Sequence, residues 1–318
     1  MTLLAKLMLA TVATMATGAV QAKTPAPVQD KPVDCDSCKE WNAAVKPFNI
    51  YGNTWYVGTA GLSAVLVTSP QGHILLDGAL PQSAPLIVAN IKALGFRIED
   101  VKYILNSHAH WDHAGGIAAL QRASGATVVA SAASAPVLQS GTNGKDDPQY
   151  QAKPVVHVAK VKTVSVVGEG EAVKVGALAL TAHMTPGHTP GGTTWTWTSC
   201  EGQRCLNVVY ADSLNPYSSG DFRYTGTGKG GTPDISASFE ASIAKVAALP
   251  CDIIIPVHPG TTDVLGKAAK RSGDSNPLID ANACRAYAAE AGSLLAKKLA
   301  KERGDAAPTA AVDAAHAH

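Results

Sequence analysis

The chain has 318 residues, of which 46% are hydrophobic and 16% charged, and its formal net charge is +1. This composition is typical of a globular protein with a mixed-charge surface, and the length suits one large domain or two small ones. The nearly balanced charge argues against nucleic acid as a partner.

The N-terminal segment predicts a secretory signal peptide. Lys6 is the single charged residue among residues 1–22, an apolar stretch covers residues 7–20, and small residues lead up to Ala22. This pattern is that of an export signal cleaved after Ala22, and the apolar stretch is too short for a stable membrane span. We therefore expect a periplasmic protein without stable membrane association, which begins with a leader segment over residues 23–47.

Apolar patterns separated by Gly and Pro predict two β-rich halves within a main domain over residues 48–303, each closing with helices. In chain order we expect strands 56–58, 62–68 and 73–77, helix 84–94, strand 101–105, a helix from 114, strands 127–130, 164–167, 171–175, 178–184, 193–198 and 207–210, helix 236–249, strand 252–256 and helix 281–301.

Three further segments lack this periodicity. Residues 140–154 and 216–233 are rich in Gly and Pro and predict long loops between the strands. Residues 304–318 are rich in Ala and predict a disordered tail, in which His316 and His318 are solvated.

The most informative motif is His-Ala-His-Trp-Asp-His at residues 108–113, which two glycines follow shortly afterwards. Imidazole is the commonest side-chain ligand for zinc, and a carboxylate is a natural companion. The motif lies between an expected strand and an expected helix, where sites on α/β sheets usually lie. It therefore predicts a metal site on a strand-to-helix loop.

Two more histidines occupy comparable positions at strand ends. His188 lies in the turn-forming stretch 185–192, and His258 follows the apolar segment 253–257. Three strand ends that each deliver histidine are able to assemble a dinuclear site from distant parts of the sequence. His73, His157 and His183 have no motif around them, and we interpret them as structural.

The order HxHxDH, then a PGHTPGG loop, then a histidine after a late strand resembles the metallo-β-lactamase superfamily over residues 48–300. The resemblance implies an α/β fold, the αββα sandwich, with the site along one edge of the sheets. The chain resembles the third subclass of class B β-lactamases in three features. It has the complete His/Asp set, it has no cysteine at residues 210–214, and it has a late cysteine pair.

This resemblance implies two Zn²⁺ ions per chain and an enzyme that hydrolyses penicillins, cephalosporins or carbapenems and confers antibiotic resistance. The sequence does not fix the oligomeric state, and we expect a monomer. Three protein ligands per zinc would leave open positions for water and substrate, as in catalytic sites. Asp112 would be catalytic, because it orients a metal-bound hydroxide that attacks the β-lactam carbonyl. The implied ligands are His108, His110 and His188 for the first zinc, and Asp112, His113 and His258 for the second.

Three residues are candidates for substrate contacts. Ser213 aligns with a serine that contacts the substrate carboxylate in relatives, whereas Asn215 stands where relatives usually carry Ser or Thr. Asparagine still donates hydrogen bonds, so we expect an altered substrate profile and not a loss of binding. Trp111 lies between two ligands and would wall the pocket, although plain packing or an ordinary turn would explain the three residues as well.

Six cysteines in an exported chain predict disulfides. We pair them in chain order, and the last two pairs resemble bridges in the family, whereas related enzymes join the N-terminal cysteine to the position of Ala60. A redox or metal role is the alternative for the C-x-x-C motif. The expected pairs are Cys35 with Cys38, Cys200 with Cys205, and Cys251 with Cys284.

Other functions remain open. A glyoxalase II-like thioesterase or a lactonase on the same scaffold would bridge its metals with an aspartate, and Asp212 stands where this bridge would be expected. A mononuclear-iron dioxygenase is disfavoured by the full set of six ligands. A non-catalytic periplasmic zinc-binding protein would bind zinc tightly without hydrolysing any substrate.

Overall fold

The structure is a computed structural model that describes residues 30–151, 158–226 and 231–304. The predicted signal peptide, the start of the leader, His157 and the tail beyond Gly304 lie outside these residues. Within the described ranges, no helix has both the length and the apolar character that crossing a membrane requires.

The first sheet has seven strands in the order β1 to β7, with antiparallel pairing from β1 to β4 and parallel pairing from β4 to β7. Its strands are β1 (Phe48–Tyr51), β2 (Thr54–Tyr56), β3 (Val65–Val67), β4 (His73–Leu76), β5 (Val101–Leu105), β6 (Thr127–Ser131) and β7 (Val164–Val167).

The second sheet has five strands in the order β12-β11-β10-β9-β8 and is antiparallel except for the β11–β12 pair. Its strands are β8 (Ala172–Val175), β9 (Leu178–Met184), β10 (Thr193–Glu201), β11 (Arg204–Ala211) and β12 (Ile253–Pro256).

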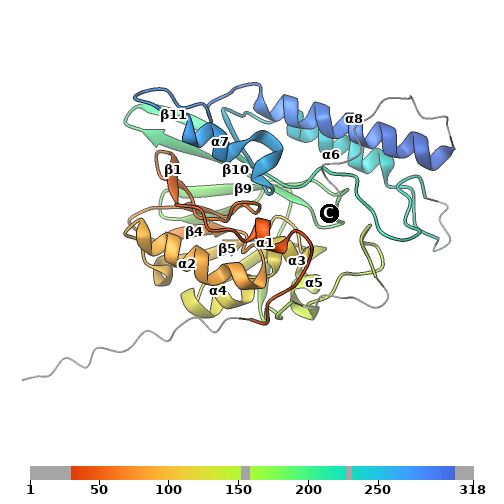
Figure 1. Ribbon diagram of the computed structural model, residues 1–318, viewed down its shortest axis with the longest axis horizontal. Helices are drawn as coiled ribbons and strands as arrows, with labels where there is room; N and C mark the ends of the chain where they lie inside the picture. The colour runs from red at the N-terminus through yellow and green to blue at the C-terminus, as the bar shows by residue number, and fades with distance from the viewer. Residues whose placement is uncertain (1–29, 152–157, 227–230, 305–318) are drawn as a thin grey trace, which may run out of the picture.

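Helices cover the outer face of each sheet, so that the chain forms four layers (Figure 1). Helices α2 and α4 pack on the first sheet, and α6 and α8 pack on the second. The helices are α1 (Cys38–Trp41), α2 (Ala84–Ala93), α3 (Trp111–Ala114), α4 (Ile117–Ser124), α5 (Ser134–Ser140), α6 (Ser236–Ala248), α7 (Val264–Ala269) and α8 (Ala283–Arg303), with short 3₁₀ turns at Pro81–Ser83, Ile98–Asp100 and Pro259–Thr262.

The alternation of side chains along the strands explains this layering. Ile104 of β5 packs toward α2 and α4, whereas Leu105 packs between the two sheets. In the same way, Ile254 of β12 faces α6 and α8, whereas its neighbours Ile253 and Ile255 face the first sheet. Successive residues of a strand point to opposite faces, so continuous apolar strands fill two layers of core at once. The αββα sandwich is therefore confirmed.

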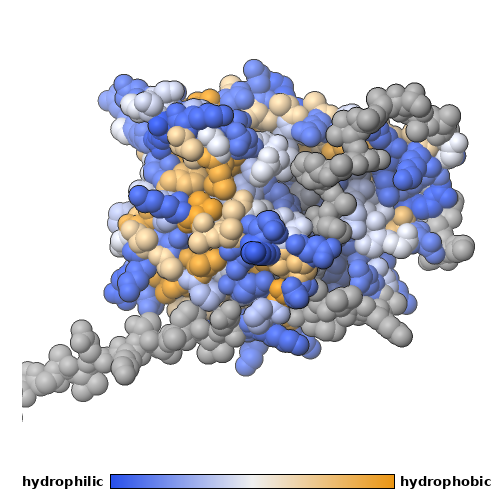
Figure 2. Space-filling model, viewed as in Figure 1, coloured by the Kyte–Doolittle hydropathy of each residue, from blue (hydrophilic) through white to orange (hydrophobic). Residues whose placement is uncertain are grey.

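The three disulfides join the cysteines in the expected order. Cys35–Cys38 closes the turn before α1, and Cys200–Cys205 joins directly paired residues of β10 and β11. Cys251–Cys284 ties the start of β12 to α8. On the visible face of the molecule, hydrophobic residues gather between β1 and α2, and hydrophilic residues cover most of the rest (Figure 2).

Four short elements, besides α7, were not predicted. β1 and the one-turn helix α1 precede the first expected strand, and α5 occupies residues before the long loop. Helix α3 contains Asp112 and His113, so half of the motif lies on a helical turn and not on an open loop. All four elements are at most seven residues long, too short to show a clear helical or strand period.

Candidate metal centre

The site lies where several strands of both sheets end. β5 ends just before His108, β9 ends just before the turn with His188, and β12 ends just before His258. The structure thus brings together all six of the expected ligand residues from the ends of three strands.

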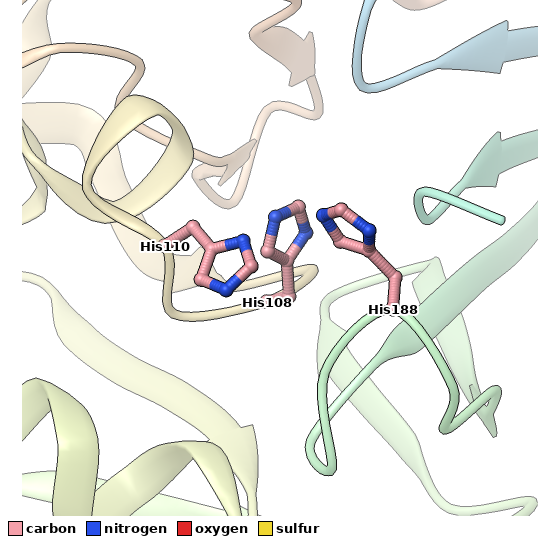
Figure 3. A group of neighbouring side chains, drawn as sticks. All are labelled: His108, His110 and His188. Atoms are coloured by element: carbon pink, nitrogen blue, oxygen red, sulfur yellow. The ribbon is translucent and has the colours of Figure 1, made fainter. Parts of the chain in front are cut away.

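The first group contains His108, His110 and His188. Each offers one ring nitrogen, and these nitrogens lie within 4.8 Å of one another. All three side chains are buried, and Figure 3 shows their rings converging from two separate loops. The group is able to hold one metal ion with three neutral imidazoles.

The second group contains Asp112, His113 and His258. Asp112 Oδ2 lies 3.1 Å from His113 Nε2 and 3.4 Å from His258 Nε2, and the two histidine nitrogens are 3.2 Å apart. Ligands at 2.0–2.1 Å from a tetrahedral zinc ion are separated by about 3.3–3.4 Å. The three atoms therefore already have the spacing that one zinc ion requires.

Backbone and carboxylate oxygens hold three of the rings from behind. Nδ1 of His108 contacts Asp212 Oδ1 at 2.7 Å, His188 Nδ1 contacts the Asn215 carbonyl at 2.8 Å, and His258 Nδ1 contacts the Gly61 carbonyl at 3.2 Å. Nδ1 then carries the proton in each case, and Nε2 is left as the ligand atom. His108 Nε2 is buried without a hydrogen-bond partner among the described residues, as expected for a metal ligand.

His110 is held through its other ring nitrogen, Nε2. Its Nε2 lies 3.1 Å and 3.0 Å from the two carboxylate oxygens of Asp147, so its Nδ1 faces the site. Asp147 was not identified from the sequence, because it lies in an irregular loop with no motif around it, and nothing distinguishes it from the adjacent Asp146.

The electrostatics of the site favour neutral His108 and His188 and an ionised Asp112. For His110, burial alone would lower the pKa, but the charge and hydrogen bond of Asp147 raise it. Burial, together with the charges of neighbouring histidines, holds the pKa of His108 well below its usual value, and burial and His110 lower the pKa of His188 to about 3. For Asp112, burial alone would raise the pKa, but the charge and hydrogen bond of His113 bring it well below the usual range. Neutral imidazoles with one ionised carboxylate form a donor set that suits zinc.

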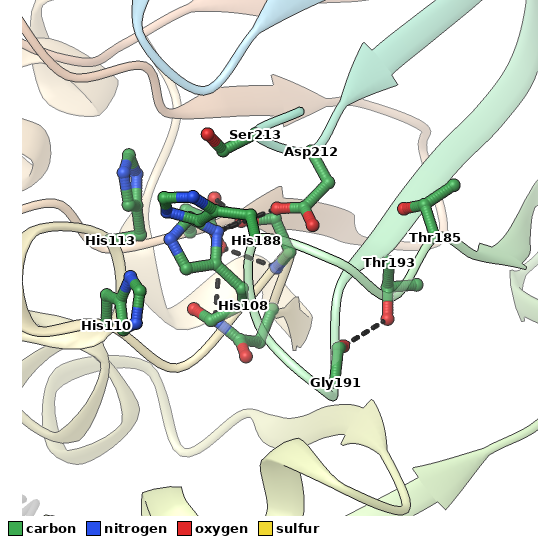
Figure 4. Close-up of polar contacts among 12 residues, drawn as sticks. His108, His110, His113, Thr185, His188, Gly191, Thr193, Asp212 and Ser213 are labelled. Atoms are coloured by element: carbon green, nitrogen blue, oxygen red, sulfur yellow. Dashed lines mark hydrogen bonds and ion pairs between the residues drawn. The ribbon is translucent and has the colours of Figure 1, made fainter. Parts of the chain in front are cut away.

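Asp212 lies behind His108 and not between the two groups (Figure 4). Its Oδ1 contacts His108, and its Oδ2 is so close to Gly192 that an added Cβ would be 2.4 Å away. Burial raises the pKa of this carboxyl well above its usual value. Asp212 therefore orients a ligand, whereas a bridging ligand would have to face both groups.

The two glycines after the motif are required by close packing. A Cβ on Gly116 would lie 2.2 Å from the Gly78 carbonyl oxygen, and one on Gly115 would lie 2.3 Å from the Trp111 carbonyl oxygen. Any larger residue would push the motif away from the turn after β4.

The expected substrate residues lie beside the second group or behind the first. Ser213 is buried, and its Oγ accepts a hydrogen bond from the Asn215 backbone at 3.4 Å. Figure 4 shows Ser213 in the neighbourhood of the histidine rings. Asn215 contacts His188 through its backbone carbonyl, so this contact does not use the Asn215 side chain.

Trp111 forms part of an aromatic group at the site. Its ring centroid lies 6.2 Å from that of Trp41, whose ring is 5.3 Å from His258. Trp41 is the last residue of α1, directly after the Cys35–Cys38 turn. Sequence reasoning missed Trp41, because only the fold places this N-terminal helix against the third strand-end histidine.

Gln149 is a further residue that the sequence did not reveal. Its side-chain nitrogen lies 3.4 Å from His110 Nδ1 and 3.4 Å from His188 Nε2, the two atoms that face the first metal position. Nothing in the composition of the predicted loop over residues 140–154 distinguished this glutamine.

Comparison with known proteins agrees with this geometry. Residues 58–201 match the model of the metallo-β-lactamase superfamily. MEM-A1, a subclass B3 metallo-β-lactamase isolated from a soil metagenome library, is 51% identical over 83% of this chain and 99% of its own, with a TM-score of 0.79. The chain belongs to the subclass B3 metallo-β-lactamases. Membership in this family implies bound metal ions.

Two further relatives are informative about B3 metallo-β-lactamases and their neighbours. SMB-1, crystallised with mercaptoacetic acid, is 47% identical over 82% of this chain and 99% of its own, with a TM-score of 0.76. A hydroxyacylglutathione hydrolase from Anaeromyxobacter dehalogenans is 33% identical over 187 residues. That match covers 58% of this chain, and the chain spans about half the length of that hydrolase (55%).

Proposed function

We propose that this protein hydrolyses the amide bond of β-lactam antibiotics with two Zn²⁺ ions and so confers antibiotic resistance. The observation that carries the proposal is the gathering of six donor atoms into two groups of three at one edge of the sandwich. The overall similarity to subclass B3 enzymes supports the same reaction.

The residues divide the work between the two groups. His108, His110 and His188 would hold the first zinc, and Asp112, His113 and His258 the second. Zinc with three protein ligands keeps open positions, lowers the pKa of a bound water to about 7 and polarises a carbonyl oxygen. The ionised Asp112 would accept a hydrogen bond from such a water and so orient it. Ser213 and Asn215 would bind the substrate carboxylate.

The structure favours this function over a thioesterase of the glyoxalase II type. An aspartate that bridges two metals has to present its oxygens to both, but Asp212 directs one oxygen to the back of His108 and the other toward Gly192. The similarity to the hydroxyacylglutathione hydrolase is also more distant than that to the B3 enzymes.

We also propose that the enzyme acts in the periplasm as a monomer. The signal-like sequence of residues 1–22 and the three disulfides support export to an oxidising compartment. An exported enzyme meets antibiotics that attack the cell wall at the place where they act.

The decisive experiment is hydrolysis of a carbapenem and a cephalosporin by the purified protein, before and after treatment with a chelator. We expect rapid turnover that chelation abolishes and added Zn²⁺ restores. Mercaptoacetic acid should inhibit reversibly, because a thiolate is a strong zinc ligand. Circular dichroism of the chelated protein is the control that the loss is due to metal and not to unfolding.

Failure of zinc-loaded, folded protein to hydrolyse either substrate would rule out the proposal. Thioester hydrolysis by the same sample would then favour the glyoxalase II-like alternative. Stoichiometric zinc binding without any hydrolysis would favour a zinc-binding protein.

The role of Ser213 gives a separate prediction. Ser213→Ala should raise KM for a carbapenem about tenfold and change kcat by less than about threefold, because a hydrogen bond to a charged group is worth about 1.5–3 kcal/mol. Steady-state kinetics test this, with Ser140→Ala, an exposed serine at the end of α5, as the matched control. An unchanged KM would remove Ser213 from the binding site.

A further inference from the structure

Asp147 is a buried carboxylate that directly follows two exposed charged residues. Its side chain is 6% exposed, although Lys145 and Asp146 just before it are exposed. A buried carboxylate is costly unless its oxygens accept hydrogen bonds, so its partners show what it does.

The first partner is a proposed metal ligand. Both oxygens of Asp147 lie within 3.1 Å of His110 Nε2. A proton on Nε2 satisfies the carboxylate and leaves the lone pair on Nδ1 to face the first metal position. Asp147 therefore determines which nitrogen of His110 is able to bind metal.

The second partner is the segment with Gln149. Asp147 Oδ1 accepts a hydrogen bond from the Gln149 backbone N–H at 2.7 Å. This bond fixes the turn from which the Gln149 side chain reaches between His110 and His188. Asp147 Oδ1 thus accepts hydrogen bonds from both His110, a proposed metal ligand, and the backbone of Gln149.

Backbone bonds make the same turn rigid and connect it across the site. Asp147 N–H donates to the Gly144 carbonyl at 3.1 Å, and Tyr150 N–H donates to the Asp147 carbonyl at 2.9 Å. The Pro148 carbonyl accepts from Ser219 N–H at 2.9 Å, in the loop that follows β11. The position of Asp147 is therefore defined independently of His110, as a positioning residue requires.

We propose that Asp147 is a positioning residue that sets the ring orientation and ligand nitrogen of His110 and, through the same oxygen, holds Gln149 over the first metal position. The inference rests on the proposed zinc centre. It couples affinity for the first zinc to the conformation of the turn at residues 144–150.

Asparagine cannot replace this carboxylate. Its single carbonyl oxygen would accept from His110 and Gln149, but its amide group would then face the protonated His110 Nε2, donor against donor. Asp147→Asn should therefore weaken metal binding as Asp147→Ala does. Loss of a residue that orients a ligand typically costs about 10–100-fold in metal affinity.

The test is zinc binding by the purified metal-free protein, measured by competition with a chromophoric chelator and without substrate. We expect Asp147→Asn and Asp147→Ala to lower affinity for one of the two zinc ions, the one at the first position, about 10–100-fold. Asp146→Asn, the exposed neighbour, should leave both affinities unchanged. Gln149→Ala should keep zinc affinity within about threefold of wild type while it alters turnover. This variant removes the Gln149 side chain but leaves the contact between Asp147 and His110 in place.

Cobalt(II) absorption provides a readout that a merely structural role would not change. A reoriented His110 should alter the ligand-field bands of the first ion in Asp147→Asn, whereas thermal unfolding of the metal-free variant should match that of Asp146→Asn. Equal zinc affinity and equal cobalt spectra in Asp147→Asn and wild type would overturn the inference. Failure of the wild-type protein to bind zinc would instead overturn the proposed metal centre itself.

Discussion

Asp112→Asn is expected to lower kcat/KM for a carbapenem by about 10²–10⁴-fold, the contribution typical of a positioned acid–base group. The substitution keeps the size of the side chain but removes the charge that the neighbouring His113 stabilises. It also removes the strongest donor of the second group, whose oxygen lies 3.1 Å from His113 Nε2 and 3.4 Å from His258 Nε2.

Two measurements distinguish this effect from general damage. Metal analysis should show that Asp112→Asn retains about one zinc ion, because the first group does not use Asp112. Asp146→Asn, an exposed aspartate in the neighbouring loop, should keep wild-type kinetics. If Asp112→Asn hydrolyses carbapenems as fast as the wild type, neither the ligand role nor the orienting role holds.

The parts of the site that the sequence predicted share one property: their positions follow from short-range pattern. Residues 108–113 are contiguous, and His188 and His258 each follow an apolar strand directly. β5 of the first sheet and β9 and β12 of the second all end at this edge of the sandwich, and the structure places the histidine nitrogens together there. The four-layer fold followed from the same strand pattern and from the family resemblance.

The residues that support the ligands could not be predicted in this way. Asp147, Gln149 and Trp41 lie in segments without periodicity, and each reaches the site only because distant loops fold over it. For Asp212, the sequence identified the residue but not its role. Its sequence context allowed a bridging ligand, and only the contact between its Oδ1 and His108 Nδ1 distinguished an orienting role.

The Cys251–Cys284 disulfide should contribute more to the free energy of unfolding than the Cys200–Cys205 disulfide. It closes a loop of 33 residues, whereas Cys200–Cys205 closes one of 5. Loop-closure entropy predicts that removing the longer bridge costs about 3–4 kcal/mol and the shorter about 2 kcal/mol. Urea unfolding of Cys251→Ala/Cys284→Ala against Cys200→Ala/Cys205→Ala measures the difference.

The longer bridge should also influence the site. Cys284 lies in the first turn of α8, and the hydroxyl of Tyr287, three residues later, donates to the Asp212 carbonyl and accepts from Leu214 N–H. Loosening of α8 would therefore release the segment that orients His108 through Asp212. Zinc affinity should fall in Cys251→Ala/Cys284→Ala but not in Cys200→Ala/Cys205→Ala, whose bridge lies on the exposed β10–β11 hairpin. Equal stability and equal zinc affinity in the two double variants would show that α8 holds its place by packing alone.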